Sequence, residues 1–175
     1  MPSRRRFLLS AATGLTALAA AGRHALPFAA AATGGNSMPA AKGAFEVTHT
    51  DAEWRRLLTP GQYAVLRQAA TERPFTSPLN DEHRSGVFSC AGCALPLYSS
   101  RTKFDSHTGW PSFWAPLPNA VSTQEDRSLF MLRTEVHCRR CGGHLGHVFD
   151  DGPPPTGLRY CMNGLAMTFK PGAAP

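Results

Sequence analysis

Charged residues are scarce in this chain of 175 residues, since Asp, Glu, Lys and Arg together make up 17%. Turn-forming residues are common, with 16 Gly and 15 Pro. This composition excludes a long-helix or coiled-coil protein and favours many turns and short strands. The length fits one domain with a modest apolar core.

A basic surface is also missing, although the formal net charge is +6. Four of the 18 Lys and Arg residues are Arg4, Arg5, Arg6 and Arg23, which leaves 14 basic residues against 12 acids in the rest. The basic residues after position 40 are scattered rather than clustered. Nucleic acid is therefore excluded as a partner, and a zinc ribbon that binds nucleic acid is excluded with it.

No apolar run in the sequence is as long as the roughly 20 residues that a transmembrane helix needs to cross a bilayer. The run Phe7–Ala21 is preceded by arginines and followed by small residues, which is typical of a signal peptide. Arg5 and Arg6 followed by Phe7 and Leu8 resemble a twin-arginine export signal. A single N-terminal membrane anchor is the alternative. No cysteine precedes Cys90, which excludes a lipid-modified N-terminal cysteine.

We therefore predict a signal peptide at 1–32, a small, flexible linker at 33–44 and a folded domain at 45–171. The mature protein is expected to be periplasmic or otherwise exported, monomeric and free of the membrane.

Two short helices are predicted at the start of the domain. Thr50 and Glu53 form a capping-box pattern, and Thr59 and Gln62 repeat it with Pro60 at the first helical position. The expected apolar faces consist of Trp54, Leu57 and Leu58 in the first helix and Tyr63, Leu66 and Ala70 in the second.

From Gly86 onward the pattern changes to short strands separated by Gly, Pro and Asn-Gly. The predicted strands are Gly86–Ser89, Leu95–Tyr98, Ser128–Val136, Gly146–Phe149, Leu158–Asn163 and Leu165–Phe169. We expect a mainly β or α+β domain built on a small antiparallel sheet or an open, barrel-like core.

Four of the five cysteines form two Cys-x-x-Cys pairs, separated by residues 94–137. Two such turns can present four thiolates to one Zn²⁺ in a closed structural site, and the adjacent Gly92 and Gly142 would permit the turns. The predicted ligands are Cys90, Cys93, Cys138 and Cys141. Disulfides are the alternative in an exported protein, although a bridge within Cys-x-x-Cys is strained.

Two other interpretations of the pairs fit less well. A thioredoxin-like motif needs a strand-to-helix context, which neither pair has. Covalent haem needs a histidine directly after the second cysteine, where this chain has Ala94 and Gly142.

The fifth cysteine, Cys161, lies in the strand-like run Leu158–Asn163. Side chains alternate along a strand, so Arg159, Cys161 and Asn163 should share a face. A guanidinium beside a thiol favours the reactive thiolate. On this run alone, an inert buried cysteine is an equal alternative.

Two further motifs contain groups that could act on such a thiol. His144 and His147 follow the second cysteine pair and could transfer protons, with Asp150 or Asp151 orienting one of them. Zinc ligation and ordinary surface positions are the alternatives for these histidines. The segment 103–114 is an expected loop with two Trp and two Phe residues, which form either a core cluster or a shallow pocket for a methyl group.

The chain resembles the B-type methionine sulfoxide reductases from about Phe45 to Lys170. The resemblance rests on ordered motifs: Leu58-Thr59-Pro60, Thr71-Glu72-Arg73-Pro74-Phe75-Thr76, the two cysteine pairs, Gly109-Trp110-Pro111-Ser112-Phe113, His144-Leu145-Gly146-His147-Val148-Phe149 and Arg159-Tyr160-Cys161-Met162-Asn163. It implies two small antiparallel sheets, a structural zinc ion and reduction of the R epimer of methionine sulfoxide in proteins or peptides.

The resemblance also implies roles for single residues. Cys161 is the nucleophile, and His144, His147 and Asn163 form the polar side of the pocket. Trp110 receives the substrate methyl group, Phe113 is expected to bind substrate beside it, and Arg159 supplies the charge beside the thiol. A thioredoxin-like protein or a small thiol is the implied reductant.

The chain departs from the family pattern at two adjacent positions. Many members have a resolving cysteine where this chain has Thr108, and His107 replaces a glycine. We therefore expect the oxidised form of Cys161 to be reduced directly by an external thiol. The functional alternative is a non-catalytic binding module held together by zinc.

Overall fold

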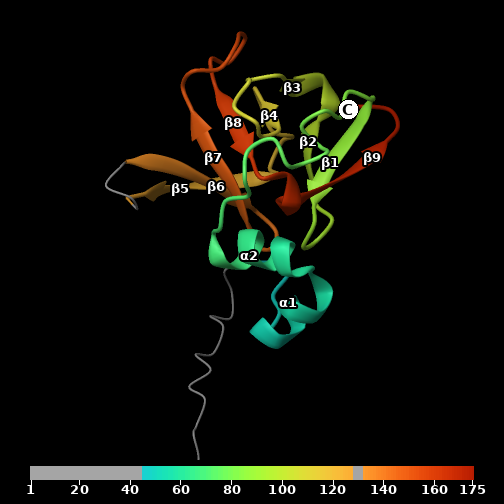
Figure 1. Ribbon diagram of the computed structural model, residues 1–175, viewed down its shortest axis with the longest axis vertical. Helices are drawn as coiled ribbons and strands as arrows, with labels where there is room; N and C mark the ends of the chain where they lie inside the picture. Colours follow the sequence, from blue (N-terminus) through green and yellow to red (C-terminus); the bar gives the residue numbers. More distant parts are fainter. Residues whose placement is uncertain (1–44, 128–131) are drawn as a thin grey trace, which may run out of the picture. The chain divides into compact units, whose positions relative to one another are not determined.

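The computed structural model describes residues 45–127 and 132–175. The predicted signal peptide and linker lie outside these residues. In these ranges two α-helices precede two sheets, which are arranged as in Figure 1. The elements are α1 (Asp51–Leu57), α2 (Pro60–Gln68), β1 (Gly86–Cys90), β2 (Pro96–Ser99), η1 (Ser100–Thr102), β3 (Lys103–Phe104), β4 (Ser112–Phe113), β5 (Val121–Asp126), β6 (Arg133–Cys138), β7 (His144–Phe149), β8 (Arg159–Met162), η3 (Gly164–Ala166) and β9 (Met167–Pro171).

Both predicted helices are confirmed, and each begins with a complete capping box. Trp54 and Leu58 are buried, but Leu57 is 60% exposed, so its predicted place on the apolar face is wrong. The reason is local: α1 ends at Leu57, and the backbone at Leu58 is extended, which turns Leu58 alone inward. Helix α2 lies against β7 and η3. No helix in the described ranges is long and apolar enough to cross a membrane.

The strands form two antiparallel sheets, with orders β2-β1-β9 and β3-β4-β8-β7-β6-β5. The predicted fold class, mainly β with two small antiparallel sheets and few helices, is confirmed. In the larger sheet β8 lies between β4 and β7, and β5 forms the edge beyond β6 (Figure 1). Strand β8 therefore carries Cys161 in the middle of this sheet.

Three strands were not predicted from the sequence. Strands β3 and β4 lie within the segment expected to be a loop, and β5 is a polar run without an apolar alternation. Strand β5 is stabilised by pairing along its whole length with β6. The predicted strand Ser128–Val136 is observed from Arg133 onward, and residues 128–131 lie outside the described ones.

The last predicted strand begins later than expected. Residues Gly164–Ala166 form the 3-10 helix η3, and β9 starts at Met167. The side chain of Glu72 accepts hydrogen bonds from the backbone N–H groups of Gly164 and Leu165. These two N–H groups therefore have hydrogen-bond acceptors without pairing with a neighbouring strand.

An aromatic cluster joins the two sheets. Phe88 on β1 and Tyr98 on β2 belong to the smaller sheet, whereas Phe113 on β4 belongs to the larger one. The Tyr98 and Phe113 rings stack with centroids 4.3 Å apart, and Phe88 meets Phe113 edge-on at 5.0 Å. All three side chains are fully buried, so this cluster fixes β4 and, through it, β8.

Candidate active site and metal centre

The two cysteine pairs meet at one point, as the spacing predicted. The Sγ atoms of Cys90, Cys93, Cys138 and Cys141 lie within 4.8 Å of one another. Backbone hydrogen bonds of 2.8 Å close the two turns, from Ala94 N to Cys90 O and from Gly142 N to Cys138 O. The left-handed residues are Ala94 and Gly142, so the expected role of Gly92 in its turn is wrong.

The sulfur positions fit a tetrahedral metal ion. Cys90 Sγ lies 3.7 Å from Cys141 Sγ, and Cys93 Sγ lies 3.5 Å from Cys138 Sγ. A Zn²⁺ ion with Zn–S bonds of about 2.3 Å would separate its sulfur ligands by about 3.8 Å. A disulfide would need about 2.05 Å. These distances agree with a four-thiolate zinc site and not with disulfides, and Cys161 is not part of the cluster.

Cys161 lies at a small pocket. On β8 it pairs with Ser112 of β4 on one side and His147 of β7 on the other. The pocket has a volume of about 130 Å³. Its lining consists of Thr71, Trp110, Arg133, Gly146, His147, Phe149, Cys161 and Asn163. The structure thus brings together the predicted residues Trp110, His147, Cys161 and Asn163.

Hydroxyl groups surround the thiol on its β4 side. Thr108 Oγ1 lies 3.9 Å from Cys161 Sγ and 2.8 Å from Ser106 Oγ. Ser106 Oγ in turn lies 2.7 Å from the buried Ser112 Oγ. The side chain at position 108 is therefore in contact with Cys161.

Burial raises the pKa of the Cys161 thiol, and contacts with Thr108, Arg159 and Ser112 lower it without cancelling this effect. The sequence predicted the influence of Arg159 correctly in direction, but burial outweighs it. Asp151 accepts two hydrogen bonds of 2.8 Å from the Arg159 guanidinium and thereby orients it. The net pKa of the Cys161 thiol is therefore above its ordinary value, which favours the neutral thiol over the thiolate in the free protein.

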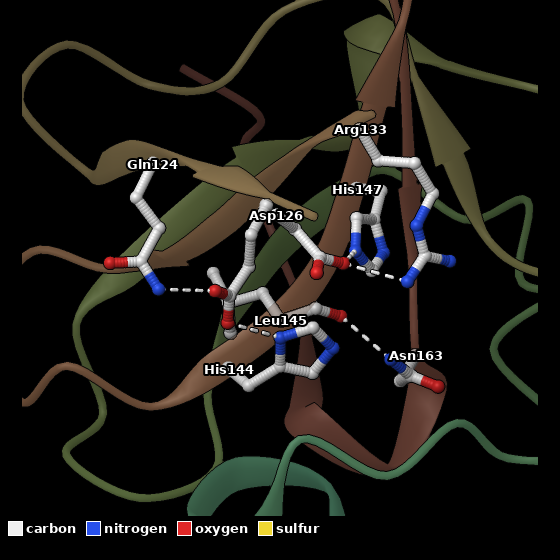
Figure 2. A network of polar contacts seen from close by, with 8 residues as sticks. Gln124, Asp126, Arg133, His144, Leu145, His147 and Asn163 are labelled. Carbon is white, nitrogen blue, oxygen red and sulfur yellow. Dashed lines mark hydrogen bonds and ion pairs between the residues drawn. The ribbon is translucent and has the colours of Figure 1, made fainter. Parts of the chain in front are cut away.

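Each histidine on β7 contacts a carboxylate from another strand of the larger sheet (Figure 2). The partner of His144 is on the adjacent strand β6, and the partner of His147 is on β5, the strand beyond β6. His147 Nε2 lies 2.8 Å from Asp126 Oδ2, which also accepts a 2.7 Å hydrogen bond from Arg133. His144 Nδ1 lies 2.6 Å from Glu135 Oε1. Gln124 donates to the other carboxylate oxygen of Glu135.

These carboxylates correct the prediction that Asp150 or Asp151 orients a histidine. Asp151 pairs with Arg159 instead, and Asp126 and Glu135 were missed. The missed residues lie on β5 and β6, and a motif could not reveal them because only the strand register brings them to the histidines. In that register Glu135 lies opposite His147, and its carboxylate contacts His144 on the same strand as His147.

The histidines differ in their environment. Burial lowers the pKa of His147, and the hydrogen bond with Asp126 opposes this effect, while the charge of Arg133 adds to it. His147 lines the pocket, whereas His144 is 5% exposed and is not among the lining residues. Burial raises the pKa of Glu135, whereas hydrogen bonds with His144 and Gln124 lower it. The lowering effects together are larger, so the net pKa of Glu135 is below its ordinary value.

The aromatic segment is divided between the pocket and the core. Trp110 lines the pocket, and its Nε1 donates a 3.1 Å hydrogen bond to Glu72 O. Phe113 is fully buried in the aromatic cluster and does not line the pocket. The structure therefore gives Phe113 a packing role in place of the predicted substrate contact, because its ring points into the space between the sheets.

A thiol at a pocket with a histidine–carboxylate pair, on a scaffold with a cysteine cluster positioned to bind a metal, is typical of a thiol-dependent enzyme. The particular family follows from comparison, because residues 58–171 match the model of the SelR domain. The chain belongs to this family, the B-type methionine sulfoxide reductases.

Three relatives illustrate the similarity, and each is named peptide methionine sulfoxide reductase MsrB. The Agrobacterium fabrum protein is 54% identical over 127 residues, covering 72% of this chain and 94% of the relative. The Leifsonia xyli protein is 55% identical over 136 residues, or 77% and 98%. The Methanosarcina barkeri protein is 54% identical over 125 residues, or 71% and 88%.

Proposed function

We propose that this chain reduces the R epimer of methionine sulfoxide in proteins and peptides, with Cys161 as nucleophile. The observation that supports this most directly is the pocket in which the Cys161 thiol, the Trp110 indole and the His147 imidazole meet. An indole wall suits the S-methyl group of the substrate, while the polar side suits the sulfoxide oxygen. The volume of about 130 Å³ is suited to the end of one side chain.

In the proposed reaction, the Cys161 sulfur attacks the sulfoxide sulfur. The S–O bond of the substrate breaks, its oxygen passes with one proton to the cysteine sulfur, and methionine leaves. Cys161 becomes a sulfenic acid, so it is oxidised by two electrons while the substrate is reduced by two. The thiol must lose its proton for this attack, and the oxygen must gain one.

His147 is the proposed proton-transfer group. Its lowered pKa favours the neutral imidazole at neutral pH, which is the form that can accept the Cys161 proton and pass it to the oxygen. Asp126 would stabilise the imidazolium formed in between. His144 and Glu135 have a different proposed role, which is to stabilise strand β7, because His144 is buried away from the pocket lining.

An external reductant completes the proposed cycle. Two thiols, from a thioredoxin-like protein or a small thiol, would reduce the sulfenic acid to the thiol and water and form a disulfide themselves. Position 108 carries a hydroxyl and not a thiol, and the other four cysteines are the candidate metal ligands. No further cysteine exists in the sequence to form an internal disulfide.

Zn²⁺ is the metal that we propose for Cys90, Cys93, Cys138 and Cys141. It would supply four metal–sulfur bonds that hold the turns together and take no part in the reaction. The turn Cys138–Cys141 connects β6 to β7, so the ion would fix the hairpin that carries His147.

We also propose that the protein is exported through a twin-arginine signal and acts as a monomer outside the cytoplasm. The basis for the export route is the segment Arg4–Ala32 of the sequence. Fusion of residues 1–44 to a reporter that is exported only in the folded state tests the route. Replacement of Arg5 and Arg6 by lysine should abolish export.

Turnover with resolved epimers tests the reaction. The purified, zinc-quantified protein should release methionine from the R epimer with a thiol reductant and leave the S epimer unchanged. Cys161→Ser should retain zinc and fold but show no turnover. If Cys161→Ser turned over the R epimer, or if the folded, zinc-loaded wild type did not, the proposal would fail and the non-catalytic binding module would be favoured.

A further inference from the structure

Glu72 carries a buried carboxylate that the proposed reaction does not use. Its residue is 8% exposed. The carboxylate accepts hydrogen bonds from the backbone N–H of Gly164 and, at 3.0 Å, of Leu165. Both groups lie in the first turn of η3, where a helix has N–H groups without intrahelical partners. Glu72 therefore caps η3 from a distant part of the chain.

This distant cap has a consequence for Asn163, the N-cap residue of η3. Asn is a preferred N-cap residue because its side chain can accept from the first-turn N–H groups. Here the Asn163 side chain makes no such bond. Its Oδ1 instead accepts from Glu72 N at 2.9 Å, and its Nδ2 donates to Leu145 O at 3.1 Å (Figure 2 shows the latter). The carboxylate thus occupies the position that Asn163 would otherwise take.

Glu72 also holds the aromatic wall of the pocket. The Trp110 indole Nε1 donates to Glu72 O at 3.1 Å. Thr71, the preceding residue, lines the pocket itself. One residue therefore connects three parts of the pocket lining: the indole of Trp110, the amide of Asn163 and Thr71.

The approach of Glu72 to η3 depends on Gly164. A Cβ atom at position 164 would lie 1.8 Å from Ser77 Oγ and 3.3 Å from Glu72 Oε1. Only glycine lets the segment that carries Glu72 and Ser77 pack so closely on η3. The contact is thus built into the packing rather than left to a flexible side chain.

We propose that Glu72 is a positioning residue, which holds Trp110 and Asn163 at the substrate pocket by capping η3 in place of Asn163. This inference rests on the proposed function for its kinetic consequence. Without the carboxylate, the Asn163 amide is free to rotate and cap its own helix, which removes it from the pocket wall and releases the Glu72 backbone that anchors the indole.

Glu72→Gln tests the proposal with little change in shape. The amide keeps one acceptor oxygen but places an NH₂ group against the second backbone N–H. We expect kcat/KM for methionine-R-sulfoxide to fall roughly ten- to hundredfold, with a raised KM, because the pocket walls are displaced. A purely structural role would lower the folded fraction and the apparent kcat, while leaving KM unchanged.

Glu82→Gln is the matched control. The Glu82 side chain is 12% exposed and also accepts from a backbone N–H, that of Arg84 at 3.0 Å, but it lies outside the pocket. We expect wild-type kcat and KM for this variant. A loss equal to that of Glu72→Gln would overturn the specific role of Glu72.

An NMR measurement gives a readout that does not depend on activity. In zinc-loaded protein, Glu72→Gln should shift the indole N–H signal of Trp110 and the side-chain amide signals of Asn163, whereas the Trp54 and Trp114 indole signals stay in place. If Glu72→Gln does not fold, Glu72→Asp replaces it, because it keeps the charge but cannot reach η3. Unmoved Trp110 and Asn163 signals with wild-type KM would refute the proposal.

The two proposals fail in different ways. If the wild type does not turn over methionine sulfoxide, the proposed function fails, and the NMR signals alone decide whether Glu72 positions the pocket. If the wild type is active and Glu72→Gln matches it in KM and spectrum, only the role of Glu72 is wrong.

Discussion

Replacing Phe113 by alanine should destabilise the domain strongly without altering substrate affinity. The ring is fully buried and contacts Tyr98 and Phe88 across the two sheets at centroid distances of 4.3 and 5.0 Å. Truncating such a core Phe to Ala costs about 3–5 kcal/mol. For a domain of this size, each kcal/mol lowers Tm by roughly 3 °C, so the expected loss is about 10–15 °C.

Thermal unfolding of the zinc-loaded protein, followed by circular dichroism, measures the loss of Tm. Steady-state kinetics well below the lowered Tm measures KM. Phe113→Leu, which keeps an apolar side chain, should lose less Tm and show the wild-type KM. Trp110→Phe is the contrasting variant, since it should raise KM with a smaller loss of Tm.

The opposite pattern would refute this reasoning. If Phe113→Leu raised KM several-fold while Tm changed little, the ring would contact substrate after all. The sequence-based expectation for Phe113 would then be restored, and the buried position would be a feature of the free protein only.

Three further predictions concern the reacting groups. Asp126→Asn should lower kcat roughly tenfold or more, because His147 loses the carboxylate that stabilises its charged form, and steady-state kinetics with an unchanged kcat would contradict this. Thr108→Cys should form an intramolecular disulfide with Cys161 after one turnover without reductant, because Thr108 Oγ1 lies 3.9 Å from Cys161 Sγ. Mass spectrometry should then find a loss of two hydrogens with zinc retained. The wild type should instead give a sulfenic acid that dimedone traps. Alkylation of Cys161 by iodoacetamide in the zinc-loaded free protein should accelerate as pH rises, with a midpoint above the ordinary pKa of a cysteine thiol, because burial raises the pKa of Cys161. A midpoint below that ordinary value would show that the charge of Arg159 outweighs burial.

Local signals in the sequence predicted the parts of the protein that local interactions determine. The capping boxes at Thr50 and Thr59 define the starts of both helices, because each cap involves residues only three positions apart. Each Cys-x-x-Cys turn is equally local, so the candidate metal site could be predicted once the two pairs were seen to provide four thiolates. The position of Cys161 on a strand followed from the same kind of pattern.

Partners that depend on strand register could not be predicted in this way. Gln124, Asp126 and Glu135 lie in polar segments that resemble any solvent-exposed edge. They reach His144 and His147 only because β5, β6 and β7 pair in one particular register. Nothing in the sequence near the histidines indicates which acids will lie opposite them, so the nearby Asp151 was the natural but wrong choice.

The protonation state of Cys161 shows the same limit for electrostatics. The neighbour Arg159 is visible in the sequence and favours the thiolate, but burial opposes it more strongly and depends on the whole pocket. This balance has a chemical meaning. A thiol with a raised pKa next to a histidine with a lowered pKa forms a neutral pair, which is less open to oxidation in the free protein than a thiolate. In the proposed reaction, the proton would move only when a bound sulfoxide excludes water and presents an oxygen to accept it, which would couple activation of Cys161 to the presence of substrate.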